Sequence, residues 1–291
     1  MKKLVSSVLV LCMIAVALAG CGNKSTETTK ATEATASTES AVSTEAVSET
    51  QAAEGEAATI QGYIAASLSN AMDEISANYK SVQPNVDLVF NAGSSGKLQT
   101  QIEEGGACDV FFSAATKQMN ALVEGGYVQE ADVTDLLENK VQLIKPAGTE
   151  TKVTGFENIT DAANLALAAD TVPVGQYARE IFDNLGITDQ VMAMEINECE
   201  DVSAVLAAVS EGSNEVGIVY ATDAASVADK VDVIATANDT ELKSKVIYPV
   251  GLVKNTEADD AEVAAAKAFV DYLKTPEAAA VFEKYGFSCI N

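Results

Sequence analysis

The residues with the clearest chemical potential lie in four short turns of small or polar residues, each followed by helical spacing. The turns are Ala66-Ser67, Ser94-Ser95-Gly96, Pro173-Val174-Gly175 and Asp201-Val202-Ser203. A helix begins with backbone N–H groups that have no partner within the helix, and its dipole makes that end positive. Four such turns, with no Arg or His among them, predict a site that holds an anion through hydrogen bonds from neutral groups.

Three of the candidate groups are hydroxyls. Ser67 directly follows a predicted strand, where a Ser is also a common helix N-cap. Ser95 lies in the loop 92–96, whose small residues let the backbone approach an anion closely. Tyr220 ends an apolar strand, so we expect a buried ring whose hydroxyl needs a partner, either a ligand oxygen or another protein group.

The remaining candidates have stronger structural interpretations. Val174 and Val202 could serve a ligand only through their backbone N–H groups, and apolar packing is the ordinary role of Val. Asp109 and Asp201 could form a catalytic carboxylate pair, but a strand start and a helix start are a weak basis for one, so structural roles are expected.

Several kinds of catalysis are excluded by composition and motif. The chain contains no His, which excludes Ser-His and Cys-His catalysis and most zinc chemistry. No GKS or GKT follows the Ser-rich loop, so this loop is not a phosphate loop of the nucleotide-binding kind.

Apolar periodicity predicts that strands and helices alternate from Thr59 onward. Strands are expected at 59–65, 86–90, 109–113, 141–144, 165–168, 216–220, 231–234 and 246–253, with helices between them and two more closing the chain. This alternation is typical of an α/β fold with mostly parallel sheets covered by helices. Because ligands of such sheets bind at the carboxyl ends of the strands, the four turns can face one crevice.

The N-terminal segment predicts secretion and a lipid anchor. Two lysines precede the apolar run 4–19, as in a secretory signal, and the run is short for a membrane span. It closes with Leu18-Ala19-Gly20-Cys21, which is similar to the bacterial lipobox, in which the Cys is lipidated. We therefore expect a signal peptide over 1–20, lipidation of Cys21 and a location on the outer face of the cytoplasmic membrane; an uncleaved anchor helix is the alternative.

Residues 21–58 are expected to form a flexible tether, because Ser, Thr, Ala and Glu dominate there and cannot form an apolar core. The chain has a formal charge of −25, of which −22 falls on residues 59–291. This acidic balance argues against nucleic-acid binding, but it does not exclude a small anion held by local N–H groups.

The cysteines outside the N-terminal segment are Cys108, Cys199 and Cys289. They lack CxxC or CxxH spacing, so they do not predict a zinc site. One disulfide is compatible with an extracellular location, but we expect these residues to be small buried apolar groups.

Several segments resemble, in order and spacing, the molybdate-binding proteins of ABC importers. They are 65–72, 93–98, 101–103, 109–114, 172–178, 200–202, 217–220, 248–250 and 272–287. The resemblance implies a two-lobed periplasmic-binding-protein-like fold of type II with a hinge. One lobe would contain 59–138 and 246–291, and the other 139–245.

The resemblance also implies a site for one tetrahedral dianion. Ser67 and Ser95 would bind it from one lobe, and Val174, Val202 and Tyr220 from the other. The two Ser and Tyr220 would donate hydroxyls, the two Ser also backbone N–H groups, and the two Val backbone N–H groups only. All contacts would be to oxyanion oxygens, so neither a cofactor nor a direct ligand of a metal ion is expected.

The expected function is that of a monomeric, non-enzymatic lipoprotein that captures molybdate, and also tungstate, and delivers it to an ABC permease. A deprotonated oxyanion only accepts hydrogen bonds, so a site made of donors favours it over a protonated phosphate. The alternatives are a binding protein for sulfate or phosphate, an extracellular α/β hydrolase, and a sensor or adhesion protein. The absence of His and of a GxSxG motif argues against the hydrolase.

Overall fold

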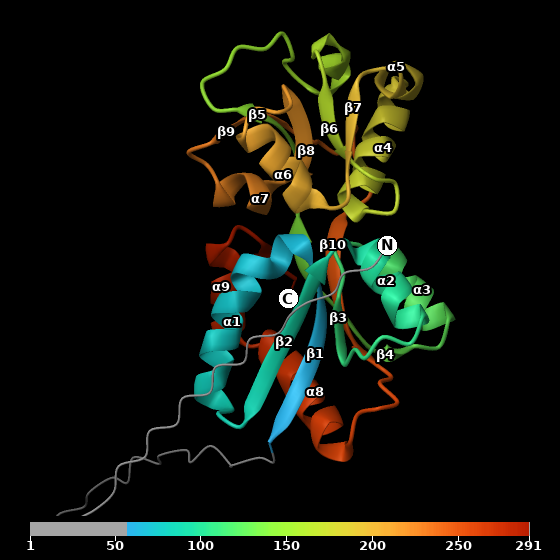
Figure 1. Cartoon of the computed structure of the whole chain (residues 1–291), viewed down its shortest axis with the longest axis vertical. Helices are drawn as coiled ribbons and strands as arrows, with labels where there is room; N and C mark the ends of the chain where they lie inside the picture. Colours follow the sequence, from blue (N-terminus) through green and yellow to red (C-terminus); the bar gives the residue numbers. More distant parts are fainter. Residues whose placement is uncertain (1–56, 291) are drawn as a thin grey trace, which may run out of the picture. The chain divides into compact units, whose positions relative to one another are not determined.

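The computed structural model describes residues 57–290, which form two sheets with helices packed on both (Figure 1). The first sheet has six strands in the order β11-β4-β10-β3-β1-β2. Their bounds are β1 Ala58–Ala65, β2 Val86–Gly93, β3 Val110–Phe112, β4 Val128–Asn139, β10 Val246–Val253 and β11 Ser288–Cys289. The part of the chain that carries this sheet is called the first lobe.

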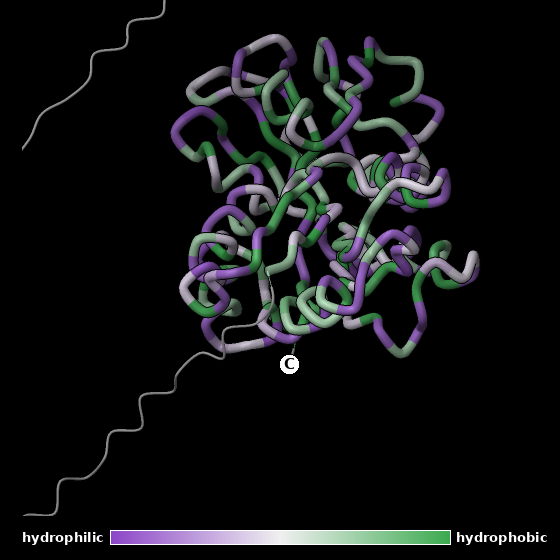
Figure 2. Tube along the Cα trace, turned by 60° about the horizontal axis from the view of Figure 1, so that its bottom comes forward, coloured by the Kyte–Doolittle hydropathy of each residue, from purple (hydrophilic) through white to green (hydrophobic). Residues whose placement is uncertain are grey.

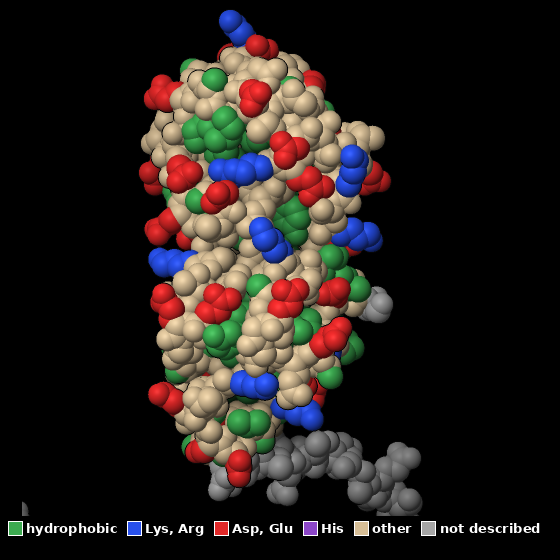
Figure 3. All heavy atoms as spheres, turned by 90° about the vertical axis from the view of Figure 1, so that its right-hand side faces the viewer, with side chains coloured by type: hydrophobic (Ala, Val, Ile, Leu, Met, Phe, Trp, Pro, Cys, Tyr) green, Lys and Arg blue, Asp and Glu red, His purple; other side chains and the backbone are tan. Residues whose placement is uncertain are grey.

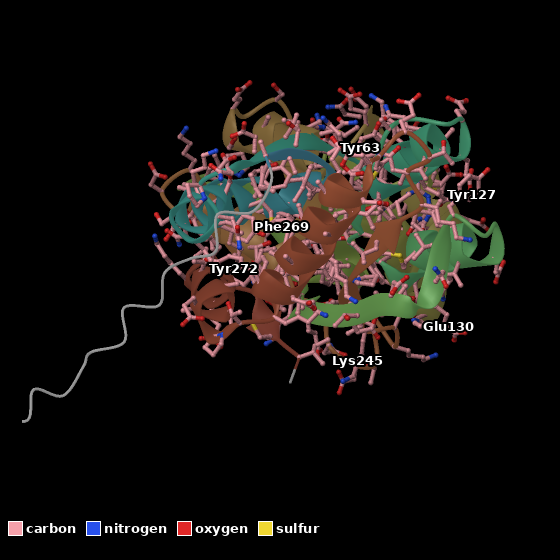
Figure 4. All side chains as sticks on the ribbon, turned by 90° about the horizontal axis from the view of Figure 1, so that it is seen from below. Tyr63, Tyr127, Glu130, Lys245, Phe269 and Tyr272 are labelled. Carbon is pink, nitrogen blue, oxygen red and sulfur yellow. The ribbon has the colours of Figure 1, made fainter. Side chains whose placement is uncertain are left out.

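Helices cover both faces of the first sheet. They are α1 Ser69–Val82, α2 Ser95–Glu103, α3 Thr116–Glu124, α8 Asp260–Leu273 and α9 Pro276–Lys284, and the short 3₁₀ turn η1 Ala66–Leu68 precedes α1. Buried residues of α2 and α3 pack around Phe111, whereas those of α1, α8 and α9 share a core with Phe112. In Figure 4, Phe269 and Tyr272 lie on the α8 side and Tyr127 on the side of α2 and α3.

The second sheet has five strands in the order β7-β6-β8-β5-β9. Their bounds are β5 Val141–Pro146, β6 Leu165–Ala168, β7 Ile196–Cys199, β8 Val216–Tyr220 and β9 Val231–Thr236. The accompanying helices are η2 Phe156–Asp161, α4 Pro173–Leu185, α5 Thr188–Met192, α6 Val202–Ser210 and α7 Ala221–Ser226. The part of the chain that carries this sheet is called the second lobe.

The chain passes between the sheets twice. It leaves the first sheet at Asn139, the last residue of β4, and enters the second at Val141; it returns between Thr236 and Val246. These passages support the predicted division at residues 138–139 and 245–246, which we keep as a proposal.

The two-lobed α/β fold is confirmed, but the expectation of mostly parallel sheets is wrong. Strand β1 is parallel to β2 and β3, and β6 is parallel to β7 and β8. The other five pairings of the described strands are antiparallel. The reason is topological: β4 leads the chain out of the first lobe, β10 brings it back, and the two pair side by side.

The predicted strands and long helices are present, but some elements were missed. Strand β4 was missed because Glu130, Asp132, Asp135 and Glu138 interrupt its apolar pattern, and between its buried first residue and its buried last residues the strand is exposed or half-buried. Strands β7 and β11 and helices α5 and α7 are too short to show a clear periodicity.

Many hydrophobic segments run through the middle of the trace, and many of the outer loops carry polar residues (Figure 2). Cys108, Cys199 and Cys289 are free thiols. Cys108 and Cys199 are buried, as expected, whereas Cys289 is only half-buried. Burial raises the pKa of Cys108 to about 12.

Acidic side chains are spread over the face drawn in Figure 3, with fewer Lys and Arg among them. Within residues 57–290, no helix combines the length and apolarity that crossing a membrane requires. The predicted signal peptide, the lipobox ending at Cys21 and most of the tether lie outside the described residues.

Candidate anion-binding site

A small cavity lies between the lobes, and its walls come from all four predicted turns. It is lined by Ala65, Ala66, Ser67, Gly93, Ser94, Ser95 and Ala114 from the first lobe and by Val172, Pro173, Asp201, Val202 and Tyr220 from the second. None of these lining residues is Lys or Arg. The cavity has a volume of about 10 Å³, enough for one small molecule or ion.

The first lobe contributes the N-terminus of α2. Ser94 is its N-cap, and the Ser94 side chain accepts a hydrogen bond from the N–H of Lys97 at 3.4 Å. Ser95 is therefore the first helical residue, and its N–H has no partner within the helix. This residue is fully buried at the cavity.

The second lobe contributes the N-termini of α4 and α6. Pro173 is the first residue of α4 and has no N–H, so Val174 supplies the first backbone donor of that helix. Val202 is the first residue of α6, directly after the N-cap Asp201, whose carboxylate accepts from the N–H of Ala204 at 2.9 Å. Val202 lines the cavity, whereas Val174 does not and directly follows the lining residues Val172 and Pro173. Both Val side chains are buried, so a role in binding would involve only their backbone N–H groups.

The hydroxyl of Ser95 is oriented by the protein. Its Oγ accepts a hydrogen bond from the N–H of Ala114 at 3.0 Å. A hydroxyl has one proton to donate, and this contact uses only a lone pair. The Ser95 proton therefore stays available for an acceptor in the cavity.

The hydroxyl of Tyr220 is a buried donor without a protein partner. Tyr220 ends β8 and is 1% exposed, and its Oη makes no hydrogen bond with the described residues. Burial raises its pKa well above the ordinary value, so the group remains an O–H donor at neutral pH. An unmatched buried donor is costly, which makes a ligand oxygen the natural acceptor.

Two acidic residues lie beside Tyr220. Asp201 lines the cavity. Asp223 accepts a hydrogen bond from the backbone N–H of Tyr220 at 3.2 Å, so the hydroxyl is the donor of Tyr220 that stays available to a ligand. Burial raises the pKa of Asp223 to about 7; the nearby Asp201 carboxylate adds to this rise, and the hydrogen bond from the Tyr220 N–H opposes it. No motif or spacing pointed to Asp223 before the structure was known.

Asp109 lies apart from this cavity. Its carboxylate accepts from the backbone N–H of Gln61 and from the side-chain amide of Asn255, both at 2.7 Å. The cavity lining includes Asp201 but not Asp109, so the two do not form a carboxylate pair there.

The lobes touch each other on several sides of the cavity. Gln118 of α3 donates to Gln176 of α4 at 3.3 Å, and Lys97 lies 3.7 Å from the carboxylate of Glu200. A Cβ added to Gly96 would lie only 2.1 Å from the carbonyl oxygen of Thr171. The structure is therefore a closed arrangement, and Gly96 makes its close approach possible.

Residues 60–288 match the family model of the bacterial extracellular solute-binding proteins. This chain belongs to that family. This chain is 38% identical over 225 residues to the Bacillus subtilis (strain 168) protein YvgL, which is named as an ABC transporter substrate-binding lipoprotein. That match covers 77% of this chain and 84% of YvgL.

Two further relatives carry names that refer to molybdenum. The molybdate-binding protein ModA of Escherichia coli (strain K12) is 36% identical over 249 residues, covering 81% of this chain and 93% of ModA. The structure named as the substrate-binding domain of a molybdenum ABC transporter from Clostridium difficile is 34% identical. It superposes with a TM-score of 0.61 and covers 81% of this chain and all of that one.

Proposed function

We propose that this solute-binding protein captures molybdate, and also tungstate, and delivers it to an ABC permease without enzymatic activity of its own. The observation that carries the proposal is the closed cavity of neutral donors. The bound ion would accept hydrogen bonds from the hydroxyls of Ser67, Ser95 and Tyr220 and from the backbone N–H groups of the two Ser residues, Val174 and Val202.

The chemistry of the ion matches this set of donors. A deprotonated tetrahedral oxyanion offers only acceptors, and helix N-termini add favourable positive potential without a compensating cation. The names of the E. coli and C. difficile relatives support the choice of a molybdenum oxyanion. Because donors come from both lobes, the ion would bridge them and stabilise the closed arrangement.

The direct test is isothermal titration calorimetry of the chain from residue 22 onward with molybdate, tungstate, sulfate and phosphate. We expect heat of binding with molybdate and tungstate and little with sulfate or phosphate. Binding of sulfate alone would overturn the assignment of the ion while leaving the assignment of the site intact.

Anchoring through Cys21 is a separate part of the proposal. It is supported by the lipobox-like tetrad at 18–21 and by the lipoprotein name of the relative YvgL. A mature monomer would then sit on the outer face of the cytoplasmic membrane through its lipid alone. We expect Cys21→Ser to abolish incorporation of a labelled fatty acid and to release the protein from the membrane fraction; continued labelling would contradict this assignment.

One observation favours a second ion, hydrogen phosphate. Asp201 lines the cavity, and its carboxylate could accept the proton of a protonated phosphate. Asp201→Asn separates the two cases, because Asn is also a good N-cap and keeps an acceptor for the N–H of Ala204. If molybdate is the ligand, losing this negative charge should raise its affinity, by about 1 kcal/mol. If phosphate is the ligand, its binding should be lost.

A further inference from the structure

A buried chain of hydrogen bonds leads from the passage between the lobes to Ser67. The backbone N–H of Lys140 donates to Asn139 Oδ1 at 2.8 Å. Asn139 Nδ2 donates to Thr222 Oγ1 at 2.9 Å and to Tyr248 Oη at 3.2 Å. Tyr248 Oη lies 2.9 Å from Ser67 Oγ. Asn139, Thr222 and Tyr248 are all buried.

The chain of hydrogen bonds has a fixed direction. Asn139 Oδ1 faces the N–H of Lys140, so its amide nitrogen faces Tyr248 and can only donate there. Tyr248 has one proton, and Ser67 Oγ lies 2.9 Å from its hydroxyl as an acceptor. Burial raises the pKa of Tyr248 well above the ordinary value, so the phenol keeps that proton. Ser67 Oγ therefore accepts from Tyr248.

This direction determines what Ser67 can offer a ligand. Its lone pair is engaged by Tyr248, so its own proton is free to point into the cavity that Ser67 lines. Ser95 shows the same arrangement, with the N–H of Ala114 in place of the Tyr248 hydroxyl. Both Ser hydroxyls thus face the cavity as donors.

We propose that Asn139 and Tyr248 are positioning residues that set the specificity of the anion site by making Ser67 a donor toward the cavity. The inference rests on the proposed function and deepens it. An oxyanion oxygen without a proton satisfies Ser67, whereas a protonated oxygen would place two donors against each other. We call the hydrogen bonds from Asn139 through Tyr248 to Ser67 the relay.

The position of the relay ties this donor to the arrangement of the lobes. Asn139 ends β4 and Tyr248 lies in β10, the two strands at which the chain passes between the sheets. Thr222 belongs to α7 of the second lobe. The second N–H of Asn139 is held by Thr222, so the amide orientation that starts the relay includes a contact to the second lobe.

Tyr248→Phe removes the proton that engages Ser67 while keeping the ring. We expect molybdate affinity to fall, by about tenfold or more, because Ser67 is then free to turn its proton away from the ion. We also expect the ratio of molybdate to phosphate affinity to fall by at least the same factor, since Ser67 can now accept from a protonated oxygen.

Tyr177→Phe is the matched control. Tyr177 is buried, its ring lies edge-on to Tyr220 at 6.4 Å, and its hydroxyl is bonded to the carbonyl of Lys245 outside the relay. Removing this hydroxyl should leave the affinity ratio unchanged. If Tyr248 served stability alone, Tyr248→Phe would lower the temperature of thermal unfolding but leave the ratio of molybdate to phosphate affinity unchanged.

Asn139→Asp tests the direction of the relay. A carboxylate can accept from the N–H of Lys140 with one oxygen and from Tyr248 with the other, so the Tyr248 proton would turn to residue 139. Ser67 would then donate to Tyr248 and lose its proton for the ion. A new negative charge could also weaken binding directly, so the substitution is measured in the native and in the Tyr248→Phe background.

Calorimetry with molybdate and inorganic phosphate on the chain from residue 22 onward decides between these outcomes. The relay predicts that Asn139→Asp weakens molybdate binding in the native background and has little further effect beside Tyr248→Phe. An equal loss in both backgrounds, or an unchanged affinity ratio in Tyr248→Phe, would overturn the inference. Failure of the unsubstituted protein to bind molybdate would instead refute the proposed function.

Discussion

Gly96→Ala tests whether the closed arrangement of the lobes is the binding state. Gly96 lies in the first turn of α2, where Ala is accommodated without backbone strain and is the better helix former. The obstacle comes from the other lobe, because the added Cβ would lie 2.1 Å from the carbonyl oxygen of Thr171. The first lobe should fold normally, but the lobes should fail to close fully.

The expected magnitude follows from the positions of the donors. A tolerable contact requires the 2.1 Å separation to grow to at least 3.0 Å, so the backbone of Thr171 must retreat by about 1 Å. Val174 lies three residues beyond Thr171, and its N–H would retreat with it. A hydrogen bond to a charged group contributes about 1.5–3 kcal/mol, so losing one should weaken binding by about 10- to 150-fold.

Calorimetry with molybdate and thermal unfolding without it are the measurements. Thr100→Ala is the control, because Thr100 is exposed on the same helix and is not among the residues that line the cavity. We expect Gly96→Ala to lose affinity without losing thermal stability and Thr100→Ala to bind normally. Native affinity in a well-folded Gly96→Ala protein would refute the view that both lobes must close on the ion.

Three further predictions concern Ser95 and Tyr220 of the cavity and Asp223 beside it. Ser95→Ala removes a donor to the ion and also the acceptor of the Ala114 N–H. Calorimetry should therefore show molybdate binding weakened by about 1.5–3 kcal/mol, and denaturant unfolding should show a lower free energy of unfolding. Tyr220→Phe should also weaken binding by about 1.5–3 kcal/mol. The free energy of unfolding without ligand should stay unchanged or rise, because the Tyr220 hydroxyl has no partner in the described structure. A marked loss of stability would argue for a structural role. Burial raises the pKa of Asp223 from 3.8 to about 7, so between these pH values the folded protein retains a proton that the unfolded chain releases. The stability that this proton provides is therefore full below pH 3.8 and is lost as the pH rises to about 7. Asp223→Asn should remove a decline of up to about 1.4 kcal/mol per pH unit between pH 5 and 7 in denaturant unfolding, whereas an unchanged pH slope would contradict the buried-acid assignment.

The alternation of elements was predictable where apolar periodicity is strong. The strand at 216–220 is entirely buried, and both it and the helix from Pro173 to Leu185 were predicted within a few residues. Strand β4 was not predicted, since the acidic residues along it, of which Glu130 and Asp135 are exposed, obscure its apolar pattern. Without β4 the antiparallel pairing with β10 could not be foreseen, and the sheets were expected to be mostly parallel.

The site was partly predictable for a different reason. Helix-start signals such as Pro173 and the Ser94-Ser95 pair are local, so they identified the turns that meet at the cavity. The relay depends on pairings of distant residues, because Asn139 and Tyr248 are 109 positions apart and Ser67 and Tyr248 are 181 positions apart. Spacing along one sequence contains no signal for such contacts.

A crystal structure of the protein with molybdate, with the metal located by its anomalous scattering, tests the central claim most directly. The account predicts one ion between the lobes, with its oxygens within hydrogen-bond distance of the hydroxyls of Ser67, Ser95 and Tyr220 and of the backbone N–H groups of Val174 and Val202. An ion bound outside this cavity, or one neutralised by a Lys, an Arg or a second metal, would contradict it.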